Sequence, residues 1–316
     1  MNAPRDTTVT AAGVRLAVDA LTVEVIPACR EAGAETILLK GSSIIDWLYG
    51  PDALRYSVDV DLLVEPGRMD AAGRALDGLG FERREPPREE RHAYQWIRAG
   101  GGPSVDLHRT LVGIGVSDEE AWDVLSRETE GLPLLGTDVA ILAPAGRALH
   151  IALHAAQHGL DIEQSVADVA QAADRLPLEL WQAAADLAER LQATSAFAAG
   201  LRLVPAGRLV ADRLRLPTWK APEVVLRETT AADMTLTLNR LVEMPGLRSK
   251  MTFALRRAFP PPELMRSRSP LARRGAAGLA AAYVSRAGWL VRRLPPATRQ
   301  VVRARREGRR TANTRG

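Results

Sequence analysis

The stretch from Lys40 to Val64, KGSSIIDWLYGPDALRYSVDVDLLV, decides the fold predicted for this chain. A Gly-Ser turn separates a short apolar run from a helix-like segment, and a second apolar run carries two aspartates one residue apart. Because side chains alternate between the faces of a β-strand, Asp59 and Asp61 project to the same side, about 7 Å apart along the backbone. The apolar residues of this run are predicted to point the other way, into a core: Val58, Val60, Leu62 and Val64.

Two carboxylates on one face of a buried strand are costly without a partner. A hard divalent cation such as Mg2+ is the natural one, because it prefers carboxylate oxygens and substrate phosphates. The Gly41-Ser42 turn can place backbone N–H groups and a hydroxyl at a helix N-terminus, which is an anion site. A later run, SVDLH over 104–108, supplies a third carboxylate, Asp106. Three carboxylates beside a phosphate-binding turn suit two-metal displacement at phosphorus, with Asp106 as an ion ligand or general base.

The composition is that of an ordinary globular protein with room for two domains. The 316 residues are 46% hydrophobic and 25% charged. Cys29 is the single cysteine, so no intramolecular disulfide is possible and a cytoplasmic location is expected. We find no signal-peptide pattern at the N-terminus and no run of about 18 apolar residues, so no transmembrane helix is predicted.

The net charge of +4 hides a division between two parts of the chain. Residues 248–316 hold 18 basic and 2 acidic side chains, a balance of +16, whereas residues 1–247 hold 24 basic and 36 acidic ones, a balance of −12. The negative body would repel a nucleic-acid backbone, so we expect neither polymerase activity nor specific nucleic-acid binding.

Periodicity predicts an α+β fold, with an N-terminal mixed sheet and helices followed by an all-helical region. Strands are predicted at 35–39, 57–64, 81–84, 92–98 and 104–108, a hairpin-like element at 132–137, and helices at 12–32, 44–50, 69–79 and 118–127. Helical patterns alone follow, at 145–158, 163–175, 179–198, 201–214, 221–242, 248–259 and 271–294. We therefore predict a catalytic domain over 1–140, a helical domain over 141–295 and a basic, disordered tail over 296–316.

Four segments resemble a known family: LLKGSS, RYSVDVDLLV, SVDLHR and HIALHAAQHG. Together, over roughly residues 12–175, they look like the uncharacterised bacterial nucleotidyltransferase family of the DNA polymerase beta superfamily. The resemblance implies a polymerase-beta-like catalytic domain and nucleotidyl transfer from an NTP to a hydroxyl with Mg2+, or alternatively Mn2+. It implies Asp59, Asp61 and Asp106 as catalytic metal ligands. The chain departs from the superfamily in the 16 residues between Ser42 and Asp59, so the segment around Arg55 must be extended.

Six further residues are predicted to bind the nucleotide. Lys40 stands beside the phosphate turn, although it could merely close a strand, and the turn itself consists of Gly41, Ser42 and Ser43. Arg55 could contact the triphosphate or pair with an acidic side chain structurally. His108 shares a strand face with the third aspartate, which suits contact with a substrate or a base.

His150, His154 and His158 recur every four residues and so lie on one face of a helix. This spacing could bind Zn2+, but neither an HExxH motif nor a cysteine accompanies it. The family resemblance places this helix beside the nucleotide cleft, together with Asp168. We interpret the three histidines mainly as helix-packing residues, with contact with the cleft or the substrate as the alternative.

Residues 271–294 combine an apolar body with arginine clusters, Tyr283 and Trp289. A basic amphipathic helix can lie on an anionic membrane surface, here the inner face of the cell membrane. Our interpretation favours a helix that closes the second domain with solvated arginines, and keeps peripheral membrane contact as the alternative.

The leading hypothesis is Mg2+-dependent transfer of an NMP group, with ATP as the expected donor, to the hydroxyl of a small molecule, a sugar or a peptide. The alternative is a catalytically silent nucleotide-binding scaffold that acts through its basic C-terminal helices. Intact motifs at all three aspartates favour the enzyme.

Overall fold

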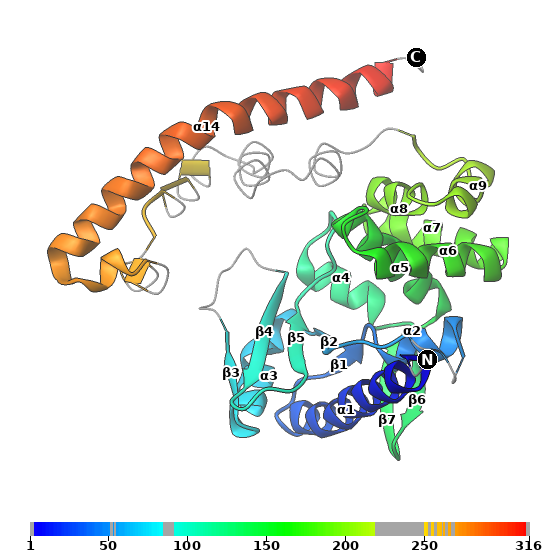
Figure 1. Ribbon diagram of the computed structural model, residues 1–316. Helices are drawn as coiled ribbons and strands as arrows, with labels where there is room; N and C mark the ends of the chain where they lie inside the picture. Colours follow the sequence, from blue (N-terminus) through cyan, green and yellow to red (C-terminus); the bar gives the residue numbers. More distant parts are fainter. Residues whose placement is uncertain are drawn as a thin grey trace. The chain divides into compact units, whose positions relative to one another are not determined.

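The computed structural model describes residues 3–50, 53, 55–84 and 92–218, and within the C-terminal segment 250–251, 254–255, 258–260, 262, 265–266 and 269–313 (Figure 1). Contacts group the chain into two compact units, Met1–Pro217 and Thr218–Gly316. The helix predicted over 221–242 lies outside the described residues, as does much of the one predicted over 248–259.

A seven-stranded mixed sheet organises the first unit, in the order β3-β4-β5-β2-β1-β7-β6. The pairs β2/β5 and β1/β7 are parallel, and the other neighbours are antiparallel. The strands are β1 (Thr36–Leu38), β2 (Asp59–Val64), β3 (Phe81–Arg83), β4 (Ala93–Arg98), β5 (Ser104–His108), β6 (Thr129–Leu134) and β7 (Thr137–Leu142). The predicted strands are therefore present, and the hairpin-like element is the β6–β7 pair.

The core lies against one face of this sheet. Val60, Leu62 and Val64 of β2 contribute to it, together with Val105 and Leu107 of β5. The helices α1 (Ala3–Glu31) and α3 (Met69–Gly78) pack on this face, the latter after the short turn η1 (Pro66–Arg68). Pro27 does not divide α1.

The prediction that Val58 belongs to the core is wrong. Its side chain is 63% exposed, and it precedes the strand, which begins at Asp59. The alternation of inward and outward side chains applies only once the chain is paired in the sheet, so it says nothing of the residue before it.

Six helices complete the first unit after α2 (Ser42–Leu48): α4 (Asp118–Leu125), α5 (Pro144–His158), α6 (Glu163–Arg175), α7 (Leu178–Arg190), α8 (Thr194–Leu201) and α9 (Pro205–Arg213). The helix predicted over 179–198 is broken at Gln192, which has a left-handed φ of 52°. Gly200 of α8 lies so close to α5 that a Cβ there would be 1.9 Å from the carbonyl oxygen of Ala152. This close approach fixes α5 within the helical layer.

The second unit contains the turn η2 (Leu271–Arg273) and the long helix α14 (Gly275–Asn313). A small buried cluster of Met265, Ala272 and Ala282 joins α14 to the segment before it, where Tyr283 donates a hydrogen bond to the Pro260 carbonyl. The helix continues through the two prolines 295 and 296, so the part of the predicted disordered tail that the structure describes is helical. Within the described residues, no helix is both long and apolar enough to span a bilayer.

The α+β fold class predicted from the sequence is thus confirmed: a mixed sheet with helices comes first, and the described residues after β7 form helices and no further strand (Figure 1). The contacts join the sheet and helices α5–α9 into one compact unit that ends at Pro217. Whether residues 1–140 and 141–295 behave as separate domains stays a prediction, to be settled by the folding of truncated chains.

Candidate active site

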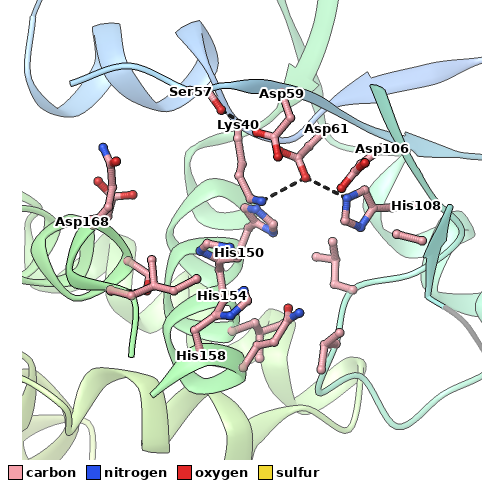
Figure 2. A pocket seen from close by; sticks show the side chains of 18 of the residues that line it. Lys40, Ser57, Asp59, Asp61, Asp106, His108, His150, His154, His158 and Asp168 are labelled. Atoms are coloured by element: carbon pink, nitrogen blue, oxygen red, sulfur yellow. Dashed lines mark hydrogen bonds and ion pairs between the residues drawn. The ribbon is translucent and has the colours of Figure 1, made fainter. Parts of the chain in front are cut away.

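The register of β2 and β5 brings the three predicted catalytic aspartates together. Asp61 is directly opposite Asp106 across the parallel pair, and Asp59 is opposite Ser104. Neighbouring strands lie about 4.8 Å apart, and residues paired in this way project from the same face. Since Val60 and Leu62 take the core face, the carboxylates lie on the face opposite to the core. Figure 2 shows Asp59, Asp61 and Asp106 close together in the pocket.

Asp61 is the centre of the cluster, with only 1% of its surface exposed. Its Oδ1 atom accepts from the Lys40 Nζ at 2.9 Å and lies 2.8 Å from the His108 Nε2. Burial would raise the pKa of the Asp61 carboxyl, but Lys40 and His108 outweigh burial and hold that pKa below its usual range. Asp61 is therefore an anion at every physiological pH, and its Oδ2 has no hydrogen-bond partner among the described residues.

Asp106 and Asp59 are placed less favourably as anions. Burial, and then the charge of Asp61, raises the pKa of Asp106 to about 6. The same two causes raise the pKa of Asp59, although it accepts a hydrogen bond of 2.9 Å from Ser57. The buried Oδ1 of Asp106 also lacks a hydrogen-bond partner within the part of the chain that the structure describes. Burial and the charge of Asp61 thus make the ionised forms of these two carboxyl groups unfavourable.

A divalent cation would satisfy what this cluster lacks. Ligand atoms of Asp61, Asp106 and His108 all lie within 4.8 Å of one another, close enough to share one ion. Two of the three are carboxylates with an unpartnered oxygen, which are the donors preferred by Mg2+. The residues present therefore fit a divalent metal, and among the described residues the group that could hold one contains His108 and not the predicted ligand Asp59.

The predicted phosphate turn lies beside the cluster but is already engaged within the chain. Gly41 has a left-handed φ of 66° and precedes α2. Ser42 donates to Asp19 at 2.7 Å, and Ser43 donates to the Lys40 carbonyl at 3.0 Å, so both buried hydroxyls are satisfied. The turn brings the Lys40 ammonium to the carboxylates, whereas the two hydroxyls face the protein interior.

Arg55 is anchored by a residue far along the chain. Its Nε and Nη2 donate to the two carboxylate oxygens of Asp168 on α6, at 2.8 and 2.7 Å. Tyr49, which follows α2, also donates to Asp168, at 2.7 Å. The remaining nitrogen of the guanidinium, Nη1, is buried without a hydrogen-bond partner among described atoms. Asp168 therefore holds the extended segment against α6 and leaves one donor of Arg55 available.

A cavity of about 570 Å³ opens in front of the carboxylates. Its lining includes Lys40, Arg55, the three aspartates, His108 and Asp168, together with residues of α5 and α6; of the described residues that form it, none comes from 41–43. Its size is within the range of small-molecule sites. Most of the predicted site residues thus share one pocket, and the three residues of the Gly-Ser turn lie behind its wall.

The histidines of α5 line the same cavity. Figure 2 shows His150, His154 and His158 one after another along the helix, leading away from Lys40 and Asp61. Burial, and then the charge of Lys40, lowers the pKa of His150 to about 3, and the same causes lower that of His154. Both rings are neutral at physiological pH. Their position on the cavity agrees with the alternative of contact with the cleft, and the main interpretation as packing residues did not place them there.

The site thus consists of carboxylates on the adjacent parallel strands β2 and β5 of a mixed sheet, facing a cavity that helices α5 and α6 also line. Residues 5–206 match the model of the family described as uncharacterised nucleotidyltransferase. The chain belongs to this family and is an enzyme of the nucleotidyl-transferring class.

Two solved structures show similarity of fold. One is the solution structure of the antibiotic-resistance factor ANT(2'')-Ia, with a TM-score of 0.41 and 16% identity over 55% of this chain and 93% of that one. The other is the crystal structure of an antigenic nucleotidyltransferase-like protein from Paracoccidioides brasiliensis, with a TM-score of 0.34 and 18% identity over 58% and 91%. Comparison with curated proteins finds no match. At these scores, no property of either protein is transferred to this chain.

Proposed function

We propose that this enzyme transfers an NMP group from an NTP, with ATP as the expected donor, to a hydroxyl of an acceptor in a Mg2+-dependent reaction. One observation carries the proposal: Asp61 and Asp106 are paired across β2 and β5, and each has a buried oxygen without a hydrogen-bond partner among the described residues. Buried polar oxygens that lack a hydrogen-bond partner are destabilising, so two of them at adjacent positions support a cation that binds there in the working enzyme.

Asp59, Asp61 and Asp106 are the proposed ligands, with His108 next to them. Bound Mg2+, or Mn2+ in its place, would lower the pKa of the attacking hydroxyl and stabilise the departing pyrophosphate. In the transfer, the acceptor oxygen bonds to the α-phosphorus as the bond from that phosphorus to the bridging oxygen breaks. Asp106 would help to bind the first ion or act as the general base that accepts the hydroxyl proton.

Two cationic side chains are proposed to bind the phosphates. Lys40 lies 2.9 Å from Asp61 and lines the cavity, so its ammonium can move from the carboxylate to a phosphate oxygen over a short distance. The free Nη1 of Arg55 can donate to the triphosphate while Asp168 keeps the rest of the guanidinium in place. The turn of Gly41, Ser42 and Ser43 acts in this proposal by orienting Lys40.

Transfer from [α-32P]ATP to a panel of hydroxyl compounds tests the proposal, with pyrophosphate release measured in parallel. We expect Mg2+-dependent release by the wild type and a loss of about a thousandfold in Asp61→Asn. Equal turnover by the variant would refute the metal role. A catalytically silent scaffold would bind ATP in calorimetry and release no pyrophosphate with any acceptor.

Contact with a membrane through residues 271–294 is a separate proposal about location, on the cytoplasmic side. This segment has five arginines and no acidic residue, and Val284 and Val291 of α14 are 72% and 70% exposed. Apolar side chains beside arginines suit the surface of an anionic bilayer. Flotation with liposomes that contain anionic lipid, for the full chain and for a chain that ends at residue 270, tests it: equal flotation of the two would refute it.

A further inference from the structure

Three histidines of α5 line the cavity, and the proposed chemistry uses none of them. The rings of His150 and His154 are stacked with centroids 5.9 Å apart, and those of His154 and His158 meet edge to face at 4.6 Å. His150 is only 5% exposed, yet neither of its ring nitrogens has a hydrogen-bond partner within the described part of the chain. An unsatisfied buried polar group costs about 1–3 kcal/mol, so a residue retained only for packing would be better replaced by an apolar one.

A shared metal ion does not explain this column of three histidines, His150, His154 and His158. Among the described residues, the group whose ligand atoms lie close enough to hold one ion is that of Asp61, Asp106 and His108, and it includes no residue of α5. The α5 rings instead contact one another in sequence along the cavity wall (Figure 2). They present a continuous surface and not a convergent set of ligands.

The two members of the column nearest to Lys40, His150 and His154, are neutral imidazoles. The depressed pKa values of His150 and His154 leave both rings uncharged, and an uncharged imidazole has one donor and one acceptor. A hydroxyl also donates and accepts, so it matches such a ring, whereas an anion would meet a lone pair at one of the two nitrogens. The apolar side chains of Leu111, Leu153 and Ile162 in the same lining also disfavour a charged ligand.

We propose that the column of His150, His154 and His158 binds the acceptor, and that the acceptor presents an uncharged, hydroxyl-bearing surface to it. This inference rests on the proposed nucleotidyl transfer. His150 is near enough to Lys40 and Asp61 for their charges to act on its ring, so it is the member of the column that meets the reacting end of the acceptor. The outer two rings bind the part of the molecule further from phosphorus.

His150→Leu is the decisive variant. Leucine has a similar volume and removes both unpartnered nitrogens, so we expect the melting temperature to stay the same or rise. Trp181→Phe is the matched control, because the fully buried Trp181 also has an unpartnered ring nitrogen but is not part of the described cavity lining. His150→Gln restores a donor and an acceptor and should recover part of the activity.

The assay measures labelled product from [α-32P]ATP with glycerol, myo-inositol and N-acetyltyrosinamide as uncharged probes, and with glucose 6-phosphate as a charged one. We expect His150→Leu to raise the KM for the uncharged probes by about tenfold, and to change the KM for ATP and the Kd for a non-hydrolysable ATP analogue by less than about twofold. An unchanged acceptor KM would mean that the histidine only packs. Loss of affinity for the analogue instead would assign the column to the nucleoside and refute acceptor binding.

A second readout separates this inference from the proposed function. If the wild type labels no probe at all, the proposed transfer fails on its own account. The site is then tested by the imidazole nitrogen resonances of the wild type with Mg2+ and the ATP analogue. Uncharged probes should shift the His150 and His154 resonances and glucose 6-phosphate should not; no shift with any uncharged probe would refute the acceptor site.

Discussion

Replacement of Asp106 by Asn is expected to stabilise the metal-free protein while it removes activity. The pKa of Asp106 is raised from 3.8 to about 6 in the folded state. Because the folded pKa lies above the unfolded one, the protonated carboxyl favours folding below pH 4, and this contribution is lost as the pH rises through 6. At pH 8 the folded protein therefore carries a penalty that the amide of Asn does not have.

The size of the penalty follows from the displacement of the pKa. Two units correspond to roughly 3 kcal/mol, and solvent screening at this partly exposed carboxyl reduces that to about 1–2 kcal/mol. For a unit of this size the variant should melt about 2–6 °C higher at pH 8 without metal. At pH 4 most of the difference in melting temperature should be gone, because the carboxyl is then protonated in the folded state and about half protonated in the unfolded state.

Mg2+ should reverse the order of the two proteins. A ligand that binds only the folded state stabilises it in proportion to its affinity, so the wild type gains more from Mg2+ and the ATP analogue than Asp106→Asn does. Differential scanning calorimetry at pH 4 and pH 8, with EDTA or with Mg2+ and the analogue, measures all four conditions. A variant that melts below the wild type at pH 8 in EDTA, or gains as much from Mg2+, would refute the reasoning.

Two further predictions concern the elements that position the site. Asp168→Asn leaves the buried Arg55 guanidinium without its counter-ion, so we expect a loss of about 3–5 kcal/mol in the free energy of unfolding, measured by denaturant unfolding. Steady-state kinetics should also show a higher KM for ATP. An unchanged KM would exclude Arg55 from the triphosphate site. Gly200→Ala forces a methyl group against the Ala152 carbonyl and should cost about 1–3 kcal/mol, whereas Gly13→Ala in α1, where the added Cβ meets no atom, should not destabilise. Equal unfolding midpoints for these two glycine variants would contradict the close contact of α8 with α5.

Local patterns were enough to predict most of the fold. The alternation in β2 placed Val60, Leu62 and Val64 in the core and the two aspartates on the other face, and the α+β class followed from the change to helical periodicity near residue 144. These predictions succeed because alternation and helical periodicity are properties of a single segment. The predictions fail where contacts with other segments decide the local structure, as at the exposed Val58 and at the turn that separates α7 from α8.

The candidate site, too, could be predicted only in part from local patterns in the sequence. The sequence identified Asp59, Asp61 and Asp106 as a set, but the pairing of β2 with β5 is what puts Asp61 opposite Asp106. The pairing of Arg55 with Asp168 joins residues 113 positions apart, and no local pattern contains it. Side chains far apart in the chain become partners only through packing, so their roles could not be read from spacing.

The sequence by itself determined the kind of chemistry, because carboxylates spaced by two in a strand must share a face wherever that strand lies. Tertiary structure alone decided how each group is used. Burial and the neighbouring Lys40 leave His150 uncharged, and the interior turn engages the hydroxyls of Ser42 and Ser43 within the chain. Charge state and available hydrogen bonds depend on every atom around a group, and only the folded chain brings those atoms together.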